Sequence, residues 1–143
     1  MPTYLCKSEP DDYSIDDLKR DGSTIWDGVT NPTACIHIRG IVKGDEILIY
    51  HTGGEKAVTG LAVATGGAYH DPERDEATTK AGDIKFPVFD LKYRKTAKTP
   101  VTLAEFKADT RFADFELVKL PRLSVMPVPP KLDTIIRELA GLS

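Results

Sequence analysis

The hydrophobic positions of this chain fall in short runs separated by glycine, proline and polar residues. Residues 4–7, 46–51 and 57–64 are rich in strand formers and predict three strands. The run at 46–51 lacks clean alternation of apolar and polar side chains, which is typical of a strand buried on both faces. Gly60 interrupts the third run and indicates a bulge or a close backbone approach. Residues 86–95 alternate well and predict a longer strand whose later part has one polar face.

Capping signals predict helices around these strands. Ser14 precedes a segment that is acidic at its start and basic at its end, and Gly22 ends that helix. Asn31, followed by proline, begins a second helix, whose apolar side continues to about Gly44. A capping box that starts at Thr102 opens a further short helix.

The rest of the chain is less regular. Residues 71–85 are polar and predict a long exposed loop, and residues 117–120 and 123–126 predict two short strands. The proline pair at 129–130 opens a last amphipathic helix. Strands and helices do not alternate as in a parallel α/β fold, so the pattern favours an α+β protein, a small curved β-barrel flanked by short helices. No repeat or linker divides the sequence, and we expect residues 1–143 to form a single domain.

Charge is distributed unevenly along the chain. The formal net charge is −3, which argues against a general nucleic-acid coat protein. Residues 1–72 contain 6 basic and 11 acidic side chains, whereas residues 73–143 contain 13 and 11. One short stretch is crowded with basic residues: Lys92, Arg94, Lys95 and Lys98. This cluster could contact a polyanion, or it could be a solvated strand edge that lysines protect from pairing.

Two features bear on the compartment. No run of about 18 apolar residues is present, and the N-terminus lacks the basic and apolar regions of a secretory signal. Cys6 and Cys35 stand in no metal-binding or redox spacing and are expected to be free buried thiols. These features favour a cytoplasmic protein without a membrane partner.

Catalytic and metal-binding motifs are sparse. A nucleophile elbow, a phosphate-binding loop and a dinucleotide fingerprint are all absent from the sequence. His37, His51 and His70 lack metal-ligand spacing to acids or cysteines, so we expect neither a metal nor another cofactor. The one conceivable acid–base pair is His51 with Glu9. The chain is therefore expected not to be an enzyme.

Trp26 is the single tryptophan of the chain. It is either a core anchor or a wall on which a planar ligand stacks. Four polar residues lie at similar junctions between predicted elements: Ser8, Asn31, His51 and Ser124. Their side chains could hydrogen-bond the edge of a nucleobase, but such residues are also common caps and turn formers. These positions alone leave both interpretations open.

Several motifs, taken in order, resemble the EVE domain family over residues 2–139. They are Tyr-Leu-Cys-Lys-Ser-Glu-Pro at 4–10, Tyr-Ser-Ile-Asp-Asp-Leu at 13–18, Trp-Asp-Gly-Val-Thr-Asn at 26–31, Lys-Gly-Asp at 43–45, Tyr-His-Thr at 50–52, Pro-Val-Thr-Leu at 100–103 and Arg-Leu-Ser-Val-Met-Pro-Val at 122–128. The resemblance implies a PUA-like mixed β pseudo-barrel, related to ASCH, YTH and SRA domains. It also implies a non-catalytic pocket for a modified base of DNA or RNA, with modified cytosine the leading candidate. The base would come from a single strand or be flipped out of a duplex.

The same resemblance implies which residues form the pocket. Carried over by position, they are Lys7, Ser8, Trp26, Val29, Asn31, Tyr50, His51, Leu123 and Ser124. Val29 and Leu123 are expected to form an apolar notch for the modifying group, which could discriminate it by about 1–3 kcal/mol. Trp26 is expected to stack on the base, and Lys7 to favour a nearby phosphate.

One stretch departs from the family pattern. Where the family usually has basic, aromatic, basic and amide residues, this chain has Thr30, Pro32, Cys35 and Ile36. Arginines there would be natural phosphate partners, so strong unaided binding to a duplex is not expected. Other basic residues are expected to contact phosphate instead: Arg39, Lys56, Lys92, Arg94, Lys95 and Arg122.

Two further functions remain open. A sensor of a small metabolite or anion, or a protein-interaction module, could use the same pocket, and the net charge of −3 mildly favours that option. A hydrolase acting on modified nucleic acid would need the pair of Glu9 and His51. The kind of modification, the choice of DNA or RNA and the oligomeric state carry no sequence motif.

Overall fold

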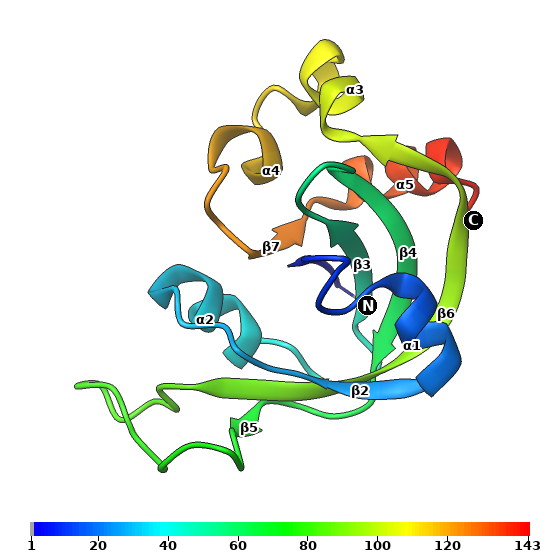
Figure 1. Cartoon of the computed structure of the whole chain (residues 1–143). Helices are drawn as coiled ribbons and strands as arrows, with labels where there is room; N and C mark the ends of the chain where they lie inside the picture. Colours follow the sequence, from blue (N-terminus) through cyan, green and yellow to red (C-terminus); the bar gives the residue numbers. More distant parts are fainter. Residues whose placement is uncertain (1) are drawn as a thin grey trace.

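The computed structural model describes residues 2–143, and within that range seven strands form one strongly curved sheet (Figure 1). The strands are β1 (Thr3–Ser8), β2 (Ser23–Trp26), β3 (Glu46–His51), β4 (Ala57–Ala64), β5 (Tyr69–His70), β6 (Pro87–Thr102) and β7 (Val125–Val128). The helices are α1 (Ile15–Asp21), α2 (Pro32–Arg39), α3 (Leu103–Ala108), α4 (Glu116–Lys119) and α5 (Pro130–Ala140), with a 3-10 turn at Thr110–Phe112.

The order of the strands leaves the barrel open between β7 and β2. Hydrogen-bonded neighbours follow the order β2, β6, β4, β3, β1, β7, and β5 pairs with β6 outside this path. β1 and β3 are parallel, and the other neighbours are antiparallel. α2 contacts both β7 and β6, so it lies across the opening (Figure 1). The segment that leads from β2 into α2 is thereby held at the mouth of the barrel.

The central strands confirm the predicted burial. β3 is buried from Ile47 to His51, and β4 is buried along its whole length. The pairing of β4 with both neighbours shifts next to Gly60, where the sequence predicted an irregularity. A Cβ atom on Gly60 would overlap the Ile15 side chain and lie 2.9 Å from the Lys95 carbonyl oxygen. The glycine therefore lets α1 pack directly on the sheet.

The N-terminal helices follow their capping signals. The capping box at Ser14 opens α1, and Gly22 closes it, as predicted. α2 begins after Asn31, as predicted, but it ends at Arg39 and not near residue 44. The N–H group of the next residue, Gly40, already bonds to carbonyl groups of the last turn and closes the helix there.

The predicted strand at 117–120 is wrong. Glu116–Lys119 is the short helix α4. The rings of Phe106 and Phe112 meet edge to face with 4.8 Å between their centroids, and Phe115 packs against both. The packing of these three rings holds α3, the 3-10 turn and α4 together. Residues 116–119 therefore form a helical turn, although the apolar residues at 117–120 had predicted a strand.

Four other strands differ from prediction, among them the two-residue β5, which was not predicted. β2 was not predicted, because it has four residues and most of them are half-buried or exposed. β6 continues past the expected end at residue 95 to Thr102, where it still pairs with β4. β7 begins two residues later than predicted, at Val125. Residues 71–85 contain no named helix or strand, in agreement with the predicted loop.

Both cysteines match their prediction. Cys6 and Cys35 are buried and free, and burial raises the pKa of the Cys6 thiol. Among residues 2–143, no helix combines the length and the apolar character that crossing a membrane requires.

Candidate functional site

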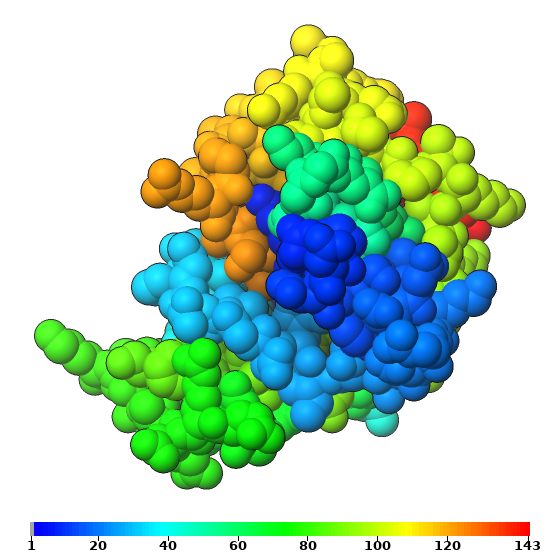
Figure 2. Space-filling view, viewed as in Figure 1, coloured from blue at the N-terminus to red at the C-terminus, as the bar shows by residue number. Residues whose placement is uncertain are grey.

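A cleft of about 630 Å³ opens beside the mouth of the barrel. Its walls come from the end of β1, the turn at 9–13 and the segment at 24–31 that leads from β2 into α2. Figure 2 shows the dark blue N-terminal turn next to the lighter blue 24–31 segment on one face of the molecule. The lining residues are Lys7, Ser8, Glu9, Asp12, Tyr13, Thr24, Ile25, Trp26, Asp27, Gly28, Val29, Thr30, Asn31 and Ser124.

Trp26 belongs both to the core and to the cleft. β2 places it opposite Phe89 of β6, and the residue is 8% exposed. Most of the indole therefore packs in the core, while part of its surface lines the space where a ligand would lie. The two interpretations that the sequence left open are compatible in this structure.

The polar residues of the cleft partly hold its own walls. The Ser8 hydroxyl donates to the Tyr13 carbonyl at 2.6 Å and closes the turn after β1. The Asn31 Oδ1 atom accepts from the Ala34 N–H at 3.0 Å and caps α2. The amide NH2 group of Asn31 can still donate to a ligand, and the Ser8 oxygen can still accept.

The charged lining of the cleft is mainly acidic. Glu9, Asp12 and Asp27 line it together with Lys7. The Lys7 ammonium donates to the Pro121 carbonyl at 3.0 Å, and partial burial lowers the pKa of Lys7 from its usual value. Carboxylates repel phosphate, but they accept hydrogen bonds from amino groups. The cleft is therefore better suited to a base edge with donors than to a phosphate.

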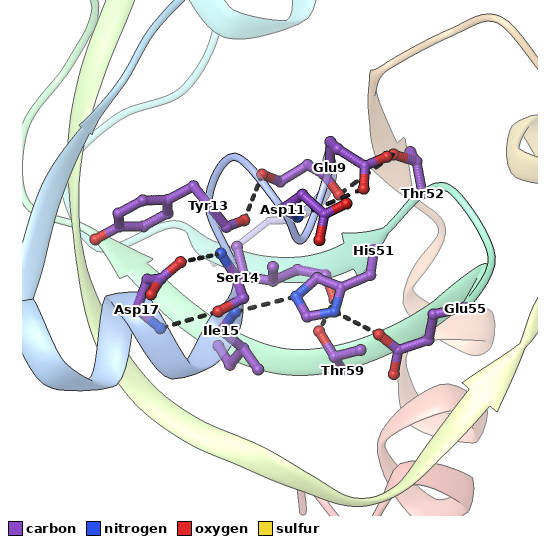
Figure 3. A network of polar contacts seen from close by, with 12 residues as sticks. Glu9, Asp11, Tyr13, Ser14, Ile15, Asp17, His51, Thr52, Glu55 and Thr59 are labelled. Atoms are coloured by element: carbon purple, nitrogen blue, oxygen red, sulfur yellow. Dashed lines mark hydrogen bonds and ion pairs between the residues drawn. The ribbon is translucent and has the colours of Figure 1, made fainter.

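His51 does not line the cleft, and Figure 3 shows its ring between Ile15 and Glu55. Its buried ring accepts at Nε2 from the Ile15 N–H, at 3.0 Å, and its Nδ1 atom lies 2.7 Å from Glu55 Oε1. Nε2 can accept only without a proton, so Nδ1 carries the proton and donates to Glu55. Both ring nitrogens are engaged, and the predicted polar contact to a base is replaced by a bond that positions α1.

Glu9 and His51 do not form the acid–base pair considered from the sequence. The Glu9 carboxylate accepts from the Thr52 hydroxyl at 3.2 Å, whereas His51 pairs with Glu55 (Figure 3). The Thr52 N–H also donates to the Ser8 carbonyl, at 2.9 Å. These bonds fasten the turn after β1 to the end of β3. In the part of the chain that the structure describes, no group of three His, Cys, Asp or Glu residues is placed to hold a metal ion.

The structure brings some of the predicted pocket residues together and separates others. Lys7, Ser8, Trp26, Val29, Asn31 and Ser124 line the cleft. Tyr50, His51 and Leu123 do not line it. Leu123 is buried in the core, and Tyr50 lines a neighbouring pocket. Ile25, which the sequence did not single out, is 42% exposed and also lines the cleft.

The basic residues expected to contact phosphate lie outside the cleft. Within residues 2–143, its lining includes none of Arg39, Lys56, Lys92, Arg94, Lys95 and Arg122. Arg39 donates to the Ile84 carbonyl at 2.7 Å, and Lys95 donates to the Ser143 carbonyl at 3.3 Å. Lys92 pairs with β2 and β4, whereas Lys95 pairs with β4 alone, so the basic cluster begins on an inner part of β6 and continues where β2 no longer pairs with it.

Several lining residues were not singled out from the sequence. They are Asp12, Tyr13, Thr24, Ile25, Asp27 and Gly28, and Thr30 had been named only as a departure from the family pattern. Asp27 and Gly28 belong to the motif at 26–31, so their membership of a known motif was an available signal. Tyr13 likewise begins the motif at 13–18, whereas Asp12 had no such signal, because its place depends on how the turn after β1 folds back.

The sequence model of the EVE domain matches residues 3–139, and the chain therefore belongs to the EVE domain family. Human thymocyte nuclear protein 1 is 30% identical over 124 residues, which are 73% of this chain and 55% of that protein. Thymocyte nuclear protein 1 of Danio rerio is 28% identical over 152 residues, with 87% of this chain and 66% of that protein covered. The chain thus spans about half the length of the human relative.

Solved structures share the fold. The NMR structure of Rpa0253 from Rhodopseudomonas palustris has a TM-score of 0.87 and 37% identity, over 99% of this chain and 94% of that one. The crystal structure of human THYN1 protein in complex with 5-methylcytosine-containing DNA has a TM-score of 0.85 and 24% identity, over 98% of each chain. The predicted α+β, PUA-like pseudo-barrel with flanking short helices is therefore confirmed.

Proposed function

We propose that this protein binds a modified nucleobase of DNA or RNA, with modified cytosine as the first candidate, and that it does so without catalysis. The observation that carries the proposal is that residues of two family motifs, at 4–10 and 26–31, line the same cleft, and that the second motif includes Trp26. The human THYN1 protein, which has the same fold, is crystallised with 5-methylcytosine-containing DNA, and this supports the choice of ligand.

The size of the cleft and its aromatic wall suit a base. A volume of about 630 Å³ falls in the range of about 300–1,000 Å³ that small-molecule sites occupy. Stacking on an aromatic side chain contributes about 1–3 kcal/mol per base. Flipping a base out of a duplex costs a few kcal/mol. Trp26 can offset part of that cost, and the polar lining must supply the rest.

The polar lining suits cytosine in particular. Asp and Glu side chains accept hydrogen bonds from the 4-amino group of cytosine, and Glu9, Asp12 and Asp27 line the cleft. Ser8 and Asn31 can bond other atoms of the base edge. For the modifying group, Val29 remains as the apolar contact, and the expected notch of Val29 and Leu123 is not formed, because Leu123 does not line the cleft.

The acidic lining also bears on how the base is presented. Phosphate groups near Glu9, Asp12 and Asp27 would be repelled. A single strand or a flipped base can place the base in the cleft while its phosphates stay outside. We therefore expect preference for such substrates over an intact duplex.

The test is a titration of the tryptophan fluorescence with oligonucleotides that contain unmodified cytosine, 5-methylcytosine or 5-hydroxymethylcytosine, as single strands and as duplexes. Because Trp26 is the single tryptophan, the signal reports on one position. Saturable quenching by modified strands, with weak or no quenching by the unmodified strand, supports the proposal. Equal binding of modified and unmodified strands, or no binding measured by a label on the oligonucleotide, contradicts it.

The two other functions considered from the sequence have less support. An anion in the cleft would face the carboxylates of Glu9, Asp12 and Asp27, which disfavours a sensor of small anions at this place. A hydrolase would need an acid–base pair, and the candidate pair of Glu9 and His51 is replaced by separate partners. The cytoplasmic location and the roles of the basic residues at phosphate stay predictions.

A further inference from the structure

A second pocket adjoins the cleft and shares Lys7 with it. It has a volume of about 320 Å³ and lies between the turn after β3, α3 and the end of α4. Figure 2 shows the teal hairpin turn beside the yellow and orange α3–α4 region, directly above the dark blue turn. The lining residues are Lys7, Tyr50, Thr52, Gly53, Lys56, Leu103, Lys107, Leu117, Val118 and Pro121.

The charge of this pocket is opposite to that of the cleft. Lys7, Lys56 and Lys107 line it, and within residues 2–143 no carboxylate does. The Lys7 ammonium lies 5.6 Å from the centre of the Tyr50 ring and is held by the Pro121 carbonyl at 3.0 Å. A ligand that combines negative charge with an apolar or planar body matches these walls.

We propose that this second pocket binds the phosphate and sugar of a nucleotide next to the modified base, so that one strand passes over Lys7 from the cleft into the pocket. The proposal rests on the proposed function of the cleft. It is supported by the shared position of Lys7 and by the charges of the two sites: Asp12 and Asp27 line the cleft and three lysines line the pocket, while the Glu9 carboxylate, bonded to Thr52, lies at the border between them. Proteins that hold single strands combine a basic groove for the backbone with aromatic surfaces for bases in the same way.

The lysines of the second pocket offer a place for phosphate near the cleft. The basic residues of β6, which were expected to contact phosphate, do not line the cleft. Lys56 was expected to contact phosphate, and the structure places it in this pocket. Lys107, on α3, also lines this pocket, and the sequence had not singled it out as a phosphate contact.

The test compares the wild-type chain with the double variant K56Q/K107Q, and uses K80Q/K131Q as the matched control because Lys80 and Lys131 are exposed and line neither pocket. Two probes are titrated at several salt concentrations: a labelled single strand with one 5-methylcytosine, and the 5-methylcytosine nucleoside, which has no phosphate. Losing the contact with one phosphate of a single strand should reduce the slope of log affinity against log salt by about 0.7. Nucleoside binding should not change, and K80Q/K131Q should behave as the wild type.

The outcomes separate this inference from the function of the cleft. If the double variant keeps both the affinity and the salt slope of the wild type, while the preference for 5-methylcytosine persists, the second-pocket inference is wrong and the cleft function stands. If wild-type protein shows no preference for the modified strand, both fall. A third outcome concerns mononucleotides without the modified base. If they bind the wild type but not K56Q/K107Q, and do not displace the labelled strand, the pocket is a separate anion site and the proposed path of one strand through both sites is wrong.

Discussion

The imidazole of His51 accepts a hydrogen bond from the backbone N–H of Ile15, at 3.0 Å, between the end of β3 and the first residue of α1. The other ring nitrogen is held by Glu55. Next to this bond, Thr52 contacts the carbonyl of Ser8 and the carboxylate of Glu9. The hairpin of β3 and β4 thereby fixes the turn that forms one wall of the cleft (Figure 3).

Replacing His51 tests this support. His51→Ala leaves the buried Ile15 N–H without its acceptor, and we expect a loss of about 1–3 kcal/mol in the free energy of unfolding. His51→Gln keeps an acceptor near the position of Nε2 and should retain much of the stability. Urea unfolding followed by circular dichroism measures both. Equal destabilisation by the two variants would show that ring packing, and not the hydrogen bond, is what matters.

Replacing Trp26 tests stacking. Trp26→Leu keeps an apolar side chain in the core but removes the aromatic face, and the affinity for a 5-methylcytosine strand should fall about 5- to 150-fold, which corresponds to about 1–3 kcal/mol. Trp26→Phe keeps an aromatic ring and should lose less. Anisotropy of a labelled oligonucleotide is the measurement, with urea unfolding as the control for folding. A folded Leu variant that binds as the wild type would leave Trp26 with a purely structural role.

The acidic lining predicts a gain of affinity from charge removal. Asp12 is exposed and lines the cleft, so Asp12→Asn should strengthen oligonucleotide binding roughly 1.5- to 5-fold at low salt, as expected for about 0.2–1 kcal/mol from an exposed charge. The neighbouring Asp11 is exposed and does not line the cleft, which makes Asp11→Asn the matched control. Similar gains in both variants would indicate a general effect of net charge.

The close approach at Gly60 predicts a stability effect. In Gly60→Ala the new Cβ would overlap Ile15 and lie 2.9 Å from the Lys95 carbonyl, and we expect a loss of about 1–3 kcal/mol. Gly54→Ala is the control, because a Cβ there has no neighbour within 4 Å. Urea unfolding of the two variants gives the comparison. A Gly60→Ala protein as stable as the control would mean that α1 moves away from the sheet at little cost.

The contact of Tyr69 with Asp90 predicts a pH dependence. The phenol donates to Asp90 at 2.5 Å, and burial together with this carboxylate raises the pKa of Tyr69 from 10.0 to about 12. The folded state therefore favours the neutral phenol, and its stabilising contribution is complete below pH 10 and is lost as the pH rises from 10 to 12. Tyr69→Phe should lack this part of the alkaline loss of stability. The measurement is the free energy of urea unfolding of the wild type and of Tyr69→Phe between pH 9 and about pH 12. The same loss of stability in both proteins would contradict a role of the Tyr69 phenol.

The agreement between sequence and structure is best where a signal is local. Ser14 caps α1 through atoms three residues away, and β3 is buried on both faces as its unbroken apolar run indicates. The error at α4 has a non-local cause, since the packing of Phe106, Phe112 and Phe115 turns a strand-like run into a helix. The missed β2 is similar, because its short sequence becomes a strand through pairing with β6.

The candidate site shows the same division. The sequence by itself determined most element positions, membership of a family through its motifs, and the prominence of Trp26. Only the tertiary structure decided that His51 bonds to Ile15 and does not line the cleft, and that Lys7 stands between an acidic cleft and a basic pocket. Caps and periodicity depend on atoms a few residues apart, which the sequence specifies directly. Neighbours across a curved sheet depend on strand register and helix docking, which arise from the packing of segments far apart in the chain.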